Sequence, residues 1–325
     1  MTELLARLDN FAASLPGVLS QGLIWGIMAI GLYITYKILE LSDLTVDGSF
    51  CTGGATCIVM MAMGYPTWLA MVCAFLAGMC TGAITGFLHT VCKIPAILSG
   101  ILTQLGLWTI NMIIMGLKDG GLVSTLTIPA RNSKLLVSAS FLRSVPKGNK
   151  PWILYPPVMM IIITAVVIGV LYWFFGTERG SSIRATGANE NMARAQGINT
   201  NMNKMIGLML ANGLVALSGS LFGQYGGNAE INMGRGAIVI GLAAIIIGDV
   251  LFGKLFKNFA LKLLAVSFGA IIYYFVIQAV LTVLKVDSQY LKLMSAAIVA
   301  LFLTIPNLRG GHFKKHKKAE VTKQC

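Results

Sequence analysis

The polar side chains that interrupt the apolar segments of this chain are its first candidates for binding chemistry. They are Asp47, Ser49, Thr52, Gln104, Asn111 and Asn212. Polar groups inside a membrane face the interior of a helix bundle or a water-filled cavity, so these six are candidates for the lining of a solute pathway. Gln104 and Asn111, seven residues apart on one helical face, are equally suited to hydrogen bonds between helices. Asp47 is equally suited to capping the helix that follows it.

A second candidate site is the polar segment 177–199, which lies between two long apolar runs. Asn189 is a good N-cap residue, and Glu190 follows in the first turn, where a negative charge suits the helix dipole. Arg194 stands four residues after Glu190, in the favourable order for an ion pair. Gly197 is suited to ending the helix in a left-handed conformation. The pattern therefore predicts a capped helix within the segment.

The predicted helix covers residues 189–196, about two turns, and is too short to be stable alone in water. We therefore expect the membrane segments to hold it on one side and a partner protein on the other. Met192 and Ala195, three residues apart, would form a small apolar knob for that partner. An ordinary capped helix at the membrane surface is the alternative.

Nothing in the residue pattern indicates enzymatic chemistry. The three histidines are scattered, and no Ser, His and Asp set or GxxxxGK[ST] phosphate-binding loop is present. Five of the six cysteines lie in or beside apolar runs, without metal-ligand spacing, and are typical of small core residues. We predict no catalytic residue, no metal site and no cofactor in this chain.

The elements that position these residues are predicted to be membrane-spanning helices. The chain has 325 residues, of which 56% are hydrophobic and 11% charged, whereas soluble domains carry about 25% charged residues. Several apolar runs reach about 20 residues, enough to cross a bilayer. The sequence predicts an all-α, polytopic integral membrane helix bundle. The positive-inside rule explains much of the net charge of +13, so no nucleic-acid partner is indicated.

We predict about 8–10 spans. They are assigned to residues 16–39, 44–63, 67–91, 96–116, 152–175, 205–222, 237–253, 262–284 and 290–305. Gly-rich polar breaks at 47–55 and 223–236 indicate two related halves with broken segments, a feature of transporters. Close approach of helices is the alternative reading of the glycines in the first break. Gly78, Gly82 and Gly86, spaced by four, predict a helix-packing stripe.

The whole chain, 1–325, is predicted to be one transmembrane domain. Residues 1–15 form an interfacial N-terminal segment, 117–151 an external loop, 177–204 a cytoplasmic loop and 308–325 a basic cytoplasmic tail. This orientation places 15 of the 25 Lys and Arg residues inside. Six of the other ten lie in the 117–151 loop and argue against it.

The segment 177–199 resembles the cytoplasmic coupling loop of ABC importer permeases of the branched-chain amino acid and sugar type. The residues that carry the resemblance are Gly187, Asn189-Glu190, Ala193-Arg194 and Gly197-Ile198, and the likeness extends over about 16–305. In that family the loop docks into a groove on the ATPase subunit. The resemblance implies that ATPase coupling involves Arg184, Gly187, Asn189, Glu190, Met192, Ala193, Arg194 and Gly197.

The resemblance also implies the partners. The chain would be the permease subunit of an ATP-driven importer in the bacterial plasma (inner) membrane. It would form a homodimer and act with two ATPase subunits, which hold ATP and Mg, and with an extracytoplasmic substrate-binding protein. Arg131, Arg143 and Lys147 would dock that binding protein, or would simply form a solvated loop surface.

The spacing around Gly187 and the residues Ala193–Gln196 are most similar to permeases for tryptophan or tyrosine uptake, which implies an amino acid, and an aromatic one, as the solute. A stand-alone ion-coupled secondary transporter is the alternative function. Such proteins place ionisable groups at mid-membrane. Here Asp249 stands near a span end and Asp47 at a span start, which argues against proton coupling.

Overall fold

The computed structural model describes residues 2–117, 120–128, 156–253, 255–256 and 258–284, with a few positions between 293 and 304. Six described helices are long and apolar enough to cross a membrane. They are α1 (Thr2–Tyr33, extended by the π-helical turn η1, Ile34–Ile38), α3 (Thr67–Thr90), α4 (Ala96–Gly116), α6 (Pro156–Gly176), α9 (Thr200–Gly226) and α11 (Phe259–Leu284). Two apolar helices are shorter: α2 (Val46–Ala62) and α10 (Ala237–Phe252).

These eight helices confirm the predicted helical membrane bundle and match its spans closely. The span predicted at 290–305, the tail 308–325 and most of the 117–151 loop, including Arg131, Arg143 and Lys147, lie outside the described residues. Residues 2–15 are helical and continue without a break into the first span, so the predicted boundary at residue 15 is not a helix boundary.

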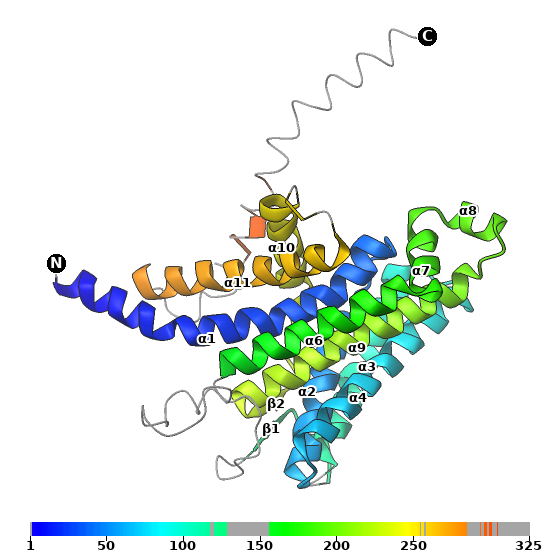
Figure 1. Ribbon diagram of the computed structural model, residues 1–325. Helices are drawn as coiled ribbons and strands as arrows, with labels where there is room; N and C mark the ends of the chain where they lie inside the picture. Colours follow the sequence, from blue (N-terminus) through cyan, green and yellow to red (C-terminus); the bar gives the residue numbers. More distant parts are fainter. Residues whose placement is uncertain are drawn as a thin grey trace.

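The long helices run side by side, and α2 lies among them (Figure 1). Thirteen of the seventeen residues of α2 are buried, which makes it the central helix of the described bundle. It packs against α9, α3 and α4, while α1 packs against α11 and α9. Beyond one end of the bundle project α7 (Glu178–Ala188) and α8 (Glu190–Ala195), away from the strands β1 and β2.

Glycines bring α9 close to its neighbours. A Cβ atom at Gly78 or Gly82 of α3 would collide with the backbone of α9, and Gly86 faces Met205 of the same helix. A Cβ atom at Gly53 of α2 would collide with the carbonyl of Ala216. The predicted packing stripe is therefore confirmed, and the glycines of the first break also serve close helix packing.

The outer helices present apolar side chains to their surroundings. In the most apolar 18-residue stretch of α4, only 28% is buried inside the protein, whereas in the corresponding stretch of α9 67% is buried. Leu105 and Trp173 are among the large apolar side chains left exposed. An aqueous surface rarely carries apolar patches of this extent, so the exposed faces of α3, α4 and α6 are suited to lipid or to another subunit.

A small sheet was not predicted. The strands β1 (Thr125–Thr127) and β2 (Asn228–Glu230) pair antiparallel, with Leu126 opposite Ala229. Three residues in each strand are too few to give a recognisable alternation of apolar and polar side chains. The pairing attaches part of the predicted external loop to the break that follows α9.

Candidate functional site

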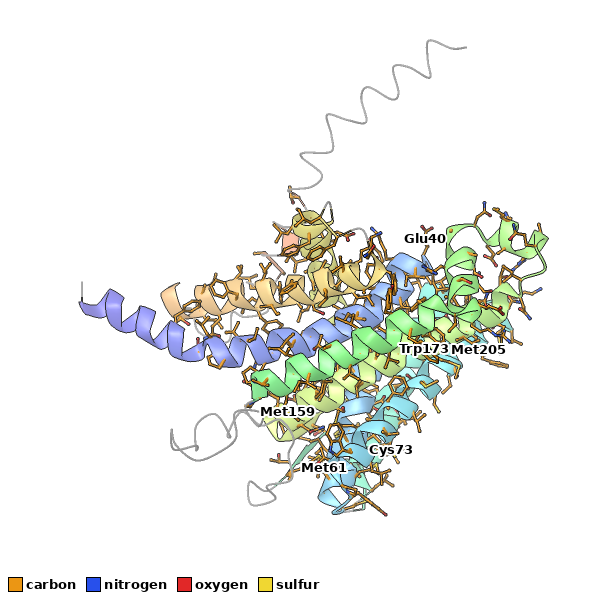
Figure 2. The ribbon with its side chains drawn as sticks, in the orientation of Figure 1. Glu40, Met61, Cys73, Met159, Trp173 and Met205 are labelled. Atoms are coloured by element: carbon orange, nitrogen blue, oxygen red, sulfur yellow. The ribbon has the colours of Figure 1, made fainter. Side chains whose placement is uncertain are left out.

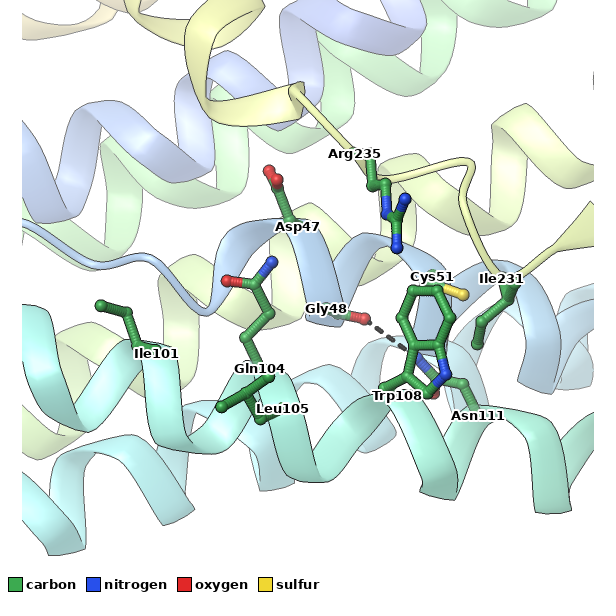
Figure 3. Close-up of a pocket in the computed structure, with 10 residues that line it drawn as sticks. All are labelled: Asp47, Gly48, Cys51, Ile101, Gln104, Leu105, Trp108, Asn111, Ile231 and Arg235. Atoms are coloured by element: carbon green, nitrogen blue, oxygen red, sulfur yellow. Dashed lines mark hydrogen bonds between the residues drawn. The ribbon is translucent and has the colours of Figure 1, made fainter.

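A cavity of about 460 Å³ lies where the start of α2 and the segment before α10 face α4. It is lined by Asp47, Gly48, Cys51, Ile101, Gln104, Leu105, Trp108, Asn111, Ile231 and Arg235 (Figure 3). The two predicted Gly-rich breaks, 47–55 and 223–236, therefore meet at one place, although they are almost 200 residues apart in sequence. The first prediction is wrong about the helix itself, because residues 47–55 lie within the continuous helix α2.

Asp47 joins the two short helices. Its carboxylate accepts hydrogen bonds from the backbone N–H groups of Gly236, at 3.1 Å, and Ile238, at 3.2 Å, in the first turn of α10. The prediction that Asp47 caps its own helix is wrong. The N-cap of α2 is Thr45, so Asp47 already lies within the first turn and its side chain reaches the neighbouring helix. A carboxylate at a helix N-terminus is electrostatically favourable.

Arg235 supplies a positive charge that the sequence reasoning missed. Its guanidinium lies 4.7 Å from the ring centre of Trp108, a cation–π contact visible in Figure 3. Among the described residues Arg235 has no carboxylate partner. Trp108 was detectable from the sequence, because it stands four residues after Gln104 on the helical face already singled out. Arg235 carried no such local signal.

Asn111 contributes an unsatisfied acceptor. Its side-chain nitrogen donates to the carbonyl oxygen of Gly48 at 3.3 Å, whereas its side-chain oxygen is buried without a hydrogen-bond partner in the described structure. A buried acceptor without a partner costs about 1–3 kcal/mol. A donor on a bound solute or a water molecule would relieve that cost. Asp47, Gln104 and Asn111 are thus the three predicted pathway residues that line the cavity.

The other three predicted pathway residues lie away from the cavity, in contacts within and between helices. Ser49 donates to the side-chain oxygen of Asn212 at 2.7 Å, and its hydroxyl lies 2.7 Å from that of Thr81. Asn212 in turn donates to the Asp43 carboxylate at 2.7 Å. Thr52 donates to the carbonyl of Gly48 in its own helix, at 3.0 Å. This network holds α2, α3 and α9 in register.

The predicted polar helix is present as α8, a single six-residue helix. The side chain of Asn189 accepts a hydrogen bond from the N–H of Met192 at 3.0 Å, and Gly197 is left-handed with φ of 80°. Glu190 pairs with Arg194 at 2.6 Å and with Lys204 of α9 at 2.7 Å. The cap, the ion pair, the terminating glycine and the length of about two turns are confirmed, because the N-cap and C-cap residues are Asn189 and Gln196.

The hydrogen bond from Lys204 is the main cause that lowers the pKa of Glu190, and the charges of Lys204 and Arg194 act in the same direction. Partial burial opposes them. The carboxylate is therefore kept ionised, and it holds α8 against the start of α9.

A second helix, α7, precedes α8 and was not predicted, because its two glycines lower helix propensity. Packing compensates for that cost. Gly187 lies against the carbonyl of Ile38 in η1, where a Cβ atom would not fit. The side-chain nitrogen of Asn203 in α9 donates to the hydroxyls of Ser182, at 2.7 Å, and Thr186, at 2.9 Å. The α7 helix is thus fixed to both η1 and α9.

Of the eight predicted coupling residues, only Ala193 is buried. Arg184 is exposed, and its guanidinium donates to the carbonyl of Phe175 at 3.0 Å. Met192 is 60% exposed and projects from α8. The surface that a partner can reach is therefore formed by Met192 and the polar groups around it.

Comparison with known proteins gives one family. The family model described as "Branched-chain amino acid transport system / permease component" matches residues 14–303. A tyrosine transport system permease protein of Clostridioides difficile is 36% identical over 90% of both chains. The ribose import permease protein of Escherichia coli is 24% identical over 90% of this chain and 85% of its own.

The fold also has a solved counterpart. The structure described as PsaBC from Streptococcus pneumoniae in complex with Fab aligns with 91% of this chain and 95% of its own, with a TM-score of 0.52 and 12% identity. The relatives are transport permeases rather than enzymes, so ATP hydrolysis belongs to a separate subunit. The chain belongs to the branched-chain amino acid transport permease family, the membrane-embedded component of ABC transport systems.

Proposed function

We propose that this chain is the permease of a bacterial inner-membrane importer for an aromatic amino acid and that the cavity at Asp47 and Arg235 is part of the solute pathway. The observation that carries the proposal is the guanidinium of Arg235, which lies beside the ring of Trp108 and has no ion pair among the described residues. The tyrosine transport permease of C. difficile supports the class of solute.

The chemistry of the cavity suits the two ends of an amino acid. The guanidinium presents paired N–H donors that match a carboxylate. The indole of Trp108 offers a face on which a second aromatic ring can stack, and Ile101, Leu105 and Ile231 complete an apolar wall. An ammonium group would find an acceptor in the unpartnered side-chain oxygen of Asn111.

Weak binding suits a pathway better than tight binding, since the solute must leave again. Asp47 is already satisfied by two N–H groups of α10, so it serves mainly to hold α10 in place. Arg235, with no ion pair in the described structure, is the group left to attract the solute.

Coupling to ATP uses the end of the bundle that carries α7 and α8. In the proposed importer α8 docks on the ATPase subunit, with Met192 as its apolar contact. Two permeases pair through the poorly buried face of α4, so that two cavities border one path, with one ATPase subunit below each permease. An external binding protein delivers the solute. The α7 and α8 end then faces the cytoplasm.

The test is uptake into vesicles that contain the permease, its ATPase and its binding protein. Arg235→Ala is expected to lower tyrosine uptake by roughly ten- to a hundredfold, because hydrogen bonds to charged groups contribute about 1.5–3 kcal/mol. The ATPase should still co-purify. Trp108→Leu is expected to reduce the preference for tyrosine over leucine.

Two outcomes would contradict the proposal. If tyrosine uptake by Arg235→Ala were unchanged, Arg235 would not be the group that binds the carboxylate of the solute. Uptake that continues without any ATPase and stops when the proton gradient is collapsed would favour the ion-coupled transporter instead.

A further inference from the structure

We propose that a groove between η1, α6, α7 and α11 binds one anionic phospholipid of the leaflet next to α7 and α8. The groove consists of two neighbouring cavities, one apolar and one basic, that share Arg184 and Phe259. This site is distinct from the solute cavity, and the inference does not depend on the identity of the solute.

The apolar arm lies at the end of the α6 span. It has a volume of about 500 Å³ and is lined by Tyr172, Trp173, Phe175, Gly176, Thr177, Arg184 and Phe259. Trp173 is 72% exposed and Tyr172 58% exposed. Aromatic side chains gather where hydrocarbon meets the headgroups, so this arm is placed to receive the upper part of an acyl chain.

The basic arm lies where the span of α1 and η1 ends and the span of α11 begins. It has a volume of about 420 Å³ and is lined by Tyr33, Lys37, Ile38, Glu40, Arg184, Gly187, Ala188, Phe259 and Lys262. Three cations, Lys37, Arg184 and Lys262, and one carboxylate, that of Glu40, line this arm. Lys37 is paired with Asp249 of α10 at 2.9 Å. Lys262 has no ion pair among the described residues and is exposed.

Arg184 connects the two arms. Its guanidinium donates to the carbonyl of Phe175 at 3.0 Å and lies 6.0 Å from the ring centre of Phe259. This contact uses one of the five N–H donors of an arginine, and no carboxylate of the described chain engages the others. A guanidinium fixed at the boundary of a span, with donors to spare, matches a phosphodiester.

The occupant we assign is a lipid rather than free phosphate, because only a lipid fills both arms. Glu40 and Trp173 both lie toward the end of the bundle that carries α7 (Figure 2). In the orientation proposed above, on which this step rests, the groove opens at the cytoplasmic surface, where basic pockets between helices are typical sites for anionic headgroups. A lipid bound there would touch η1, α7 and α11 together and would stabilise the coupling segment against the bundle.

The experiment uses the full chain purified in neutral detergent, and it measures lipid binding by native mass spectrometry and by the shift of the unfolding temperature. Phosphatidylglycerol should bind and raise the unfolding temperature, whereas phosphatidylcholine and inorganic phosphate should not. Lys262→Gln should weaken phosphatidylglycerol binding roughly fivefold, the effect of one lysine near an anionic headgroup. Trp173→Ala should weaken it too, through the apolar arm.

Lys93→Gln is the matched control, because Lys93 is an exposed lysine of the turn between α3 and α4 and lies outside the groove. It should leave binding unchanged, and an equal loss in Lys93→Gln and Lys262→Gln would overturn the site. If inorganic phosphate raised the unfolding temperature as much as phosphatidylglycerol does, the groove would be a site for a free anion, and the lipid proposal would be wrong. An equal shift with phosphatidylcholine, or full binding by Trp173→Ala, would also overturn the proposal.

Discussion

Replacing Asp47 tests the contact that joins the two short helices at the cavity. Asp47→Ala removes two hydrogen bonds, of 3.1 and 3.2 Å, and leaves the N–H groups of Gly236 and Ile238 without their acceptor. Loss of an N-cap costs about 0.5–2 kcal/mol, and a hydrogen bond to a charged group contributes about 1.5–3 kcal/mol. Because the two terms describe overlapping contacts, we expect a loss of about 2–3 kcal/mol in the free energy of unfolding.

Asp47→Asn refines the test. Gly236 and Ile238 donate to different oxygens of the Asp47 carboxylate, so asparagine, with one acceptor oxygen, keeps only one of the two hydrogen bonds. Asparagine also lacks the charge that interacts with the α10 dipole, a term of about 0.3–1 kcal/mol. We therefore expect a loss of about 1–2 kcal/mol for this variant, no larger than that of Asp47→Ala. The assay is equilibrium unfolding in mixed micelles, with hydrogen exchange at residues 236–238 as a local measure.

The control is Glu230→Gln, which removes the same charge from an exposed residue of β2 whose carboxylate has no ion pair in the described structure. It should change the free energy of unfolding by no more than about 0.5 kcal/mol. The reasoning fails if both Asp47 variants match this control, or if Asp47→Asn destabilises the protein more than Asp47→Ala.

Three further predictions concern packing, pH and orientation. Gly82→Val should lower stability by at least about 2 kcal/mol, because the α9 backbone occupies the space, whereas Gly106→Val, which meets open space, should cost under about 1 kcal/mol in the same unfolding assay. The pKa of Glu190 is lowered in the fold, first by the hydrogen bond from Lys204, so its stabilising contribution is complete above its ordinary value of 4.5 and is lost as pH falls through the lower folded pKa. Hydrogen exchange over 190–195 should therefore accelerate only in acid below that value, and Glu190→Gln should remove the transition. Cys92, exposed in the turn between α3 and α4, should react with an impermeant maleimide only from the side that carries α7 and α8, as peptide mapping by mass spectrometry can establish.

The span positions were predictable because their signals are local. A run of about 20 apolar residues identifies a membrane helix without knowledge of its neighbours. The cap at Asn189, the ion pair of Glu190 and the terminating Gly197 likewise depend on residues within one or two turns. The four-residue spacing of Gly78, Gly82 and Gly86 is enough to predict a packing stripe. It does not reveal that the partner helix is α9.

The features that were missed depend on residues far apart in the chain. Asp47 was assigned to its own helix, yet its carboxylate caps α10, 189 residues away. Arg235 lies within the Gly-rich break 223–236, whose sequence gave no reason to place it beside Trp108. Ser49 and Asn212 were singled out as polar residues within apolar segments, but only the fold shows that they bind each other across α2 and α9.

The contacts between the coupling segment and the cavity form a closed ring. From α7 the ring passes through Asn203 to α9, and from α9 through the Ser49 contact to α2. Asp47 then carries it from α2 to α10, and the pair of Asp249 with Lys37 returns it to η1, against which Gly187 packs. A displacement of α7 therefore reaches the cavity from two directions. Because packed interfaces change between discrete arrangements rather than deforming smoothly, a shift at α7 would move both short helices and, with them, the segment that holds Arg235.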